Sequence, residues 1–205
     1  MAKLITAKRA VFSTVVLLLI LVPLTLAALS PLLSAREPVY IIGGLAGVLG
    51  LCLLLLQPLL AAGFFPGTLL TKQRSWHAFT GGLLIVSVLA HIVGLYLTSP
   101  PDMIDALLLV SPTPYSLYGV IALWGIVVLS VVTLPVVRRR LKPARWRLVH
   151  NMVGALVVGT TVTHAVMIDG TMDRRSKLVL CAAAVIATLC ATLWLRWIRH
   201  RRQVL

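Results

Sequence analysis

Residues 74–98, RSWHAFTGGLLIVSVLAHIVGLYLT, are almost entirely apolar, yet they include His77 and His91. Residues 145–168, RWRLVHNMVGALVVGTTVTHAVMI, repeat this arrangement with His150 and His164. In both stretches the two histidines are fourteen residues apart. On an α-helix this step is almost four turns, so the second histidine is rotated by only about 40° and lies about 21 Å farther along the axis. Each stretch therefore predicts one helix with two histidines on one face, at two depths.

The composition is that of a membrane protein. The chain has 205 residues, of which 60% are hydrophobic and 12% charged, with a mean hydropathy of +1.01. A soluble domain is typically about 25% charged. Long uncharged stretches reach the roughly 20 apolar residues that a membrane-spanning helix needs, and they lack the alternating polarity of a β-barrel strand. We therefore expect an all-α membrane protein, a six-helix bundle that forms a single domain over residues 1–205. The expected helices cover roughly residues 10–33, 39–63, 75–98, 116–137, 146–168 and 177–197.

The distribution of charge predicts the topology. With the N-terminus in the cytoplasm, the inner segments hold fifteen Lys and Arg residues and the outer loops hold four, while all five acidic residues fall in outer loops. This asymmetry follows the positive-inside rule and places both termini in the cytoplasm, in an inner cell membrane. It also makes the first apolar run a retained helix, although a signal peptide is the alternative. The net charge of +14 is then explained by topology and contact with anionic membrane lipid, and no nucleic acid is expected as a partner.

The histidines point to a cofactor. The third and fifth helices run in the same direction, so His77 and His150 lie near the cytoplasmic ends and His91 and His164 near the outer ends. If the two helices face each other, each depth holds two imidazoles. Two axial histidines saturate a haem iron, whereas zinc needs tetrahedral ligands clustered at one point. The haem sites are therefore expected between the third and fifth helices. Interhelical hydrogen bonding or proton relay by the histidines, in a haem-free membrane subunit, is the alternative.

Three arginines accompany the inner pair. Arg74 lies one turn before His77, and Arg145 and Arg147 lie about one turn before His150. Each can form charge-assisted hydrogen bonds to a haem propionate. Taken singly, each arginine is explained equally well as a topology signal.

The segments RSWHAFTGG…AHIVGL and RWRLVHNMVGA…THAVMI resemble the ferric reductase-like transmembrane domain, and the likeness covers nearly the whole chain. The family includes ferric-chelate reductases, the membrane half of NADPH oxidases and the haem-binding subunit of the periplasmic methionine-sulfoxide reductase system. The resemblance implies two b-type haems that pass electrons across the membrane. By position, His77 and His150 would hold the inner haem, and His91 and His164 the outer one.

One departure from the family concerns the electron donor. The chain ends with RWIRHRRQVL, and we expect no flavin or nicotinamide domain in it. FAD or FMN is then expected only on a partner protein, a cytosolic flavin reductase. A quinol donor is the alternative, in a cytochrome b subunit that feeds a periplasmic reductase. A periplasmic acceptor protein is a further expected partner, so the chain would be an oxidoreductase or its haem-binding membrane subunit.

Overall fold

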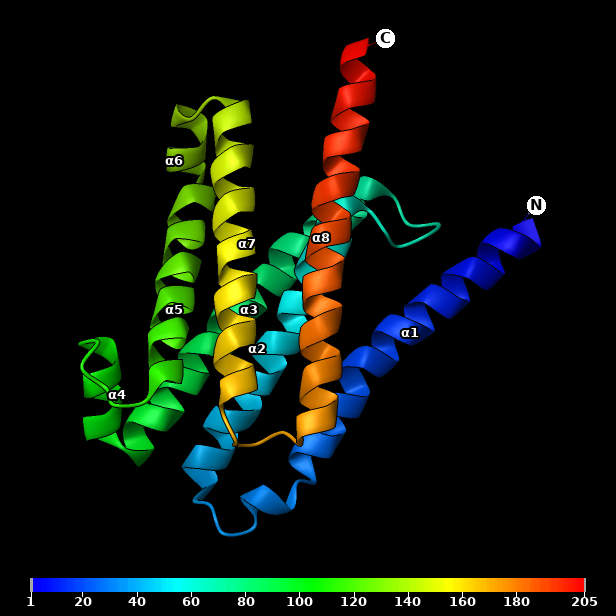
Figure 1. Ribbon diagram of the computed structural model, residues 1–205. Coiled ribbons are helices and arrows are strands. Elements are labelled where there is room, and N and C mark those ends of the chain that lie inside the picture. The colour runs from blue at the N-terminus through cyan, green and yellow to red at the C-terminus, as the bar shows by residue number, and fades with distance from the viewer. Residues whose placement is uncertain (1, 205) are drawn as a thin grey trace. The chain divides into compact units, whose positions relative to one another are not determined.

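The computed structural model describes residues 2–204, and the side chains of residues 7–196. All regular structure in this described part is helical (Figure 1). Six of the described helices are long and apolar enough to cross a membrane, which confirms an all-α, multi-pass membrane protein. These helices are α1 (Ala2–Ala28), α2 (Pro38–Ala62), α3 (Leu70–Thr98), α5 (Pro114–Thr133), α7 (Pro143–Met167) and α8 (Arg174–Val204). The short helices are η1 (Pro31–Leu33), α4 (Pro100–Leu107) and α6 (Pro135–Arg140).

The chain packs as two compact units. The first contains the residues up to Thr98 together with those from Asp169 onward, and the second contains Ser99–Ile168. Helix α3, with His77 and His91, belongs to the first unit, whereas α7, with His150 and His164, belongs to the second.

Helix α2 is the core of the first unit. It packs along α3, α8 and α1, and half of its most apolar stretch is buried (Figure 1). Glycines allow α2 and α3 to approach closely: a Cβ atom built on Gly43 would lie 3.1 Å from Cα of Gly94. Leu51, Cys52 and Leu55 fill the middle of the same helix with at most 4% exposure. The position of α3 along α2 is therefore fixed by direct backbone contact.

A buried glutamine fixes the loop between α2 and α3. Gly63 caps α2 directly after Ala62, and its φ of 77° suits a residue without Cβ; the amide of Phe64 donates to the carbonyl of Leu59. Gln73 is only 1% exposed and binds this loop back onto α3. Its Oε1 accepts from the amide of Phe65, and its Nε2 donates to the carbonyl oxygens of Phe65 and Thr68.

In the second unit, α5 packs along α7 (Figure 1). Helix α5 ends at Thr133, four residues before the predicted end of this span at residue 137. The cause is Pro135, which has no amide hydrogen to donate and keeps the preceding residue out of the helical region. Leu134 accordingly has φ −56° and ψ 137°. The chain then forms α6 before a second proline, Pro143, begins α7.

Candidate functional site

His91 is seated against the backbone of α2. Its Nδ1 lies 2.8 Å from the carbonyl oxygen of Gly43. A carbonyl oxygen only accepts, so Nδ1 carries the hydrogen, and in the neutral ring the lone pair is on Nε2. A Cβ atom on Gly47 would lie 2.8 Å from the same Nδ1. Position 47 must therefore be glycine for the imidazole to reach the carbonyl in this geometry.

His77 makes the equivalent contact farther along α2. Its Nδ1 lies 3.1 Å from the carbonyl oxygen of Gln57. The side chain of Gln57 in turn donates from Nε2 to Thr80 Oγ1 at 2.9 Å. Gln57 therefore holds α3 in two ways, through its carbonyl to the histidine and through its amide to the next turn of the helix.

The two contacts share one helix register. Gly43 and Gln57 are fourteen residues apart on α2, the same separation as His91 and His77 on α3. Because the two helices run in opposite directions and have the same rise per residue, equal steps keep both pairs opposite each other. The predicted spacing of the histidines on α3 is thus matched by an equal spacing of their acceptors.

His164 makes the same kind of contact in the second unit, from its imidazole to a backbone carbonyl. Its Nδ1 lies 2.8 Å from the carbonyl oxygen of Tyr115 on α5, and the Tyr115 ring packs edge-on against the imidazole. A Cβ atom on Gly119 would lie 2.8 Å from the His164 ring. As at Gly47, the glycine lies four residues after the acceptor, one helical turn further along, and makes room for the ring.

His150 lies against an aromatic ring. The rings of Trp146 and His150 are stacked, with centroids 5.1 Å apart and an angle of 18° between their planes. His77 and His150 also occupy equivalent places in their helices, each seven residues after the first residue, Leu70 in α3 and Pro143 in α7. All four histidines are partly buried.

The glycines of α3 and α7 divide into two groups. A Cβ atom on Gly82, Gly154 or Gly159 would meet no heavy atom of the described residues within 4 Å. Of these three, Gly154 lies one turn after His150 on the same side of α7, so it leaves open backbone beside that histidine. Gly94 instead packs against Gly43, so its small size serves the contact between α2 and α3.

The three arginines expected at the inner haem are all exposed. Arg74 lies on α3, and Arg145 and Arg147 lie on α7. Two neighbouring cations lie over tryptophan rings: Lys72 Nζ is 5.2 Å from the centre of the Trp76 ring, and Arg138 Cζ is 4.7 Å from that of Trp146. These ends of α3 and α7 are therefore basic and aromatic, although a role of the arginines in propionate binding stays a prediction.

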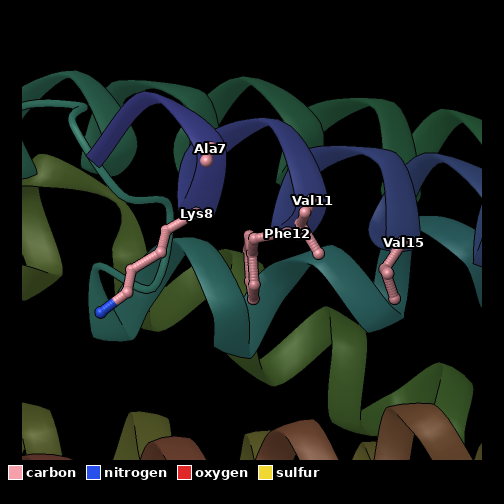
Figure 2. A pocket seen from close by; sticks show the side chains of 5 residues that line it. All are labelled: Ala7, Lys8, Val11, Phe12 and Val15. Atoms are coloured by element: carbon pink, nitrogen blue, oxygen red, sulfur yellow. The ribbon is translucent and has the colours of Figure 1, made fainter. Parts of the chain in front are cut away.

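A separate groove lies along α1. Figure 2 shows the side chains that line it: Ala7, Lys8, Val11, Phe12 and Val15. The groove is apolar apart from Lys8, and it includes none of the histidines or arginines singled out above.

The acceptor residues were not found by sequence analysis. Every residue has a carbonyl, so the sequence does not single out Gly43, Gln57 or Tyr115 as acceptors. The available signal was the glycine content of α2 and α5, which includes Gly47 and Gly119, because a helical glycine costs about 1 kcal/mol relative to alanine and needs a reason. Close packing of an imidazole is that reason here.

One comparison with known proteins matches the chain. The family model described as "Ferric reductase like transmembrane component" matches residues 46–161, slightly more than half of the chain. This region contains His77, His91 and His150 together with Gly47 and Gly119, whereas His164 lies three residues beyond its end. Searches of curated proteins and of solved structures found no match.

Proposed function

The chain belongs to the ferric reductase-like transmembrane family, and from this premise we propose that it carries electrons across a cell membrane through two b-type haems. His77 and His150 hold the haem near the cytoplasmic face, and His91 and His164 hold the haem near the outer face. Both termini lie in the cytoplasm, and the membrane is the inner membrane of a bacterial-type cell. Arg74, Arg145 and Arg147 bind the propionates of the inner haem.

The state of the imidazoles is the observation that supports this proposal. Among the described residues, three of the four intramembrane histidines direct Nδ1 at a backbone carbonyl oxygen. This fixes the tautomer and leaves Nε2 as the atom with a lone pair. Histidines that bind metals are commonly held in this way, by a hydrogen bond from the other ring nitrogen to a carbonyl or carboxylate. The open backbone at Gly154, one turn after His150, provides space for a flat ring beside that histidine.

A bis-histidine haem exchanges single electrons without an open coordination position, which favours electron transfer over oxygen binding. The protein's own contribution is to fix two ligand pairs about 21 Å apart along the helices and to surround them with apolar side chains. The donor is a cytosolic flavoprotein that carries FAD or FMN, and the acceptor lies on the outer face. The chain then acts as an oxidoreductase or as its haem-binding membrane subunit.

The haem content and the ligand pairs test the proposal directly. We expect two non-covalent haem b groups per chain by pyridine haemochrome analysis. His77→Ala and His150→Ala should abolish the same redox transition, and His91→Ala and His164→Ala the other. His200→Ala is the matched control and should keep both haems. A colourless purified protein would refute the proposal and favour the haem-free proton-relay alternative, and a value near one haem would refute the two-site arrangement.

The donor is tested in proteoliposomes of known orientation. Stopped-flow absorbance would follow haem reduction by a flavin reductase with NAD(P)H, and separately by a quinol. We expect rapid reduction by the flavin reductase. Rapid reduction by the quinol alone would replace the flavoprotein with the quinol-coupled alternative and leave the haem sites unaffected.

A further inference from the structure

The end of α5 explains why Trp146 lies where it does. A helix leaves its last carbonyl oxygens without partners, and Pro135 ends α5 abruptly after Thr133. The indole Nε1 of Trp146 donates to one of these oxygens, that of Val132, at 3.0 Å. The tryptophan is therefore held by the helix end that the proline creates.

The same indole lies against His150. Trp146 and His150 are four residues apart on α7, so their side chains share one face of the helix. Their rings are nearly parallel, 18° apart in angle with centroids separated by 5.1 Å. The guanidinium of Arg138, from α6, lies 4.7 Å from the indole centre. Two elements outside α7 thus hold the ring that rests on the imidazole.

We propose that Trp146 is a positioning residue that fixes the ring plane of His150, the inner-haem ligand, with Arg138 holding the indole in place. This inference rests on the proposed function. The imidazole plane of His150 then follows the plane of the indole, whose orientation is set by the Val132 carbonyl and by Arg138.

Tryptophans near membrane surfaces also act as simple anchors, and Trp76 provides the comparison. Trp76 is likewise near the start of its helix and has a cation, Lys72, over its ring. It immediately precedes His77, however, and adjacent residues do not share a helix face. An anchoring role would make the two tryptophans equivalent, whereas a positioning role assigns the effect to Trp146.

The test compares Trp146→Leu, Trp146→Phe and the control Trp76→Leu by electron paramagnetic resonance of the oxidised protein. In Trp146→Leu we expect a shift and broadening of the low-spin haem signal that His150→Ala removes. Trp146→Phe keeps a ring that can stack but loses the Nε1 donor, so its signal should shift less than that of Trp146→Leu. Trp76→Leu should leave the signal unchanged.

Three results would overturn the proposal. The first is a native signal in Trp146→Leu, and the second is an equal change in Trp76→Leu. The third is haem loss in both Trp146 variants, because the hydrogen bond from Trp146 Nε1 to the Val132 carbonyl would then be the important contact and not the stacked ring. Haem loss in Trp146→Leu alone supports the proposal.

The haem-free protein separates this inference from the proposed function. In its NMR spectrum, the ring protons of His150 should be shifted upfield by the indole, and Trp146→Leu should remove that shift. Absence of the shift overturns the positioning role whether or not haem binds. Its presence in a protein that cannot bind haem would refute the proposed function while supporting the stack.

Discussion

Replacing Gly47 with alanine should weaken the outer haem selectively. The new Cβ atom would lie 2.8 Å from Nδ1 and 3.0 Å from Cε1 of His91. Ordinary contacts of this kind begin near 3.4 Å, so the ring must withdraw by roughly half an ångström. That movement lengthens the 2.8 Å contact between Nδ1 and the Gly43 carbonyl and changes the direction of Nε2, the atom proposed to bind the outer haem.

The size of the effect follows from the contact that is lost. Loss of a hydrogen-bond partner behind a metal ligand typically lowers metal affinity about 10–100-fold. Each factor of ten corresponds to about 1.4 kcal/mol, so we expect a loss of roughly 1.4–2.8 kcal/mol in haem affinity. The change from glycine to alanine also favours the helix by about 1 kcal/mol, and a control must share this gain.

Gly50→Ala is that control. It lies one turn further along α2, and its Cβ atom would meet its nearest neighbours at the ordinary distances of 3.8–3.9 Å. The assay is the rate of haem transfer from detergent-solubilised protein to excess apomyoglobin. Gly47→Ala should release one haem faster than Gly50→Ala does, and Gly119→Ala should release the same haem through His164. Equal release from Gly47→Ala and Gly50→Ala would refute the reasoning.

Three further predictions concern stability, titration and the donor. Gln73→Ala removes three partly buried hydrogen bonds to the preceding loop and should lower the free energy of unfolding by about 1–3 kcal/mol, measured by thermal unfolding in detergent; an unchanged midpoint would contradict this. The hydroxyl and amide of Ser176 donate to the carboxylate of Asp173 and lower the pKa of that carboxyl. The stabilising effect of this charge on the folded state is therefore present at neutral pH and is lost as the pH falls through the lowered pKa. NMR titration should give a midpoint below the ordinary aspartate value, and Ser176→Ala should raise it. Charge reversal at Arg139 and Arg140 should slow haem reduction by a flavin reductase in stopped-flow experiments, most at low ionic strength, where the Debye length is about 30 Å at 0.01 M; rates that do not depend on salt would contradict an electrostatic encounter.

The membrane spans were predictable because hydropathy is a local property of the chain. Each long apolar run became a helix, and prolines account for both ends of α5 and for the start of α7. The helix expected through residue 137 ends at Thr133, since Pro135 interrupts its hydrogen bonding. The common orientation of His77 and His91 was also predictable, because it depends only on the number of residues per turn.

The hydrogen bonds of the histidines to backbone carbonyls were less predictable, because they depend on which helices pack against each other. The spacing within α3 does not reveal that α2 supplies its acceptors, since that requires the packing of Gly43 against Gly94. The spacing of four residues between Trp146 and His150 allows the stack, but the contacts that hold the indole come from Val132 on α5 and Arg138 on α6, which are not evident from the sequence. The pairing of ligands between α3 and α7 stays a prediction, tested by the histidine variants.

The shared register of α2 and α3 makes this part of the chain sensitive to changes in length. One residue inserted between Gly43 and Gln57 would rotate the two halves of α2 by about 100° relative to each other. Whichever acceptor kept its histidine, the other would turn away. Exchange of the buried leucines between them for apolar residues of similar volume should cost less than about 1.5 kcal/mol. Related chains should therefore vary freely in which apolar residues occupy this segment, while insertions and deletions within it should be rare.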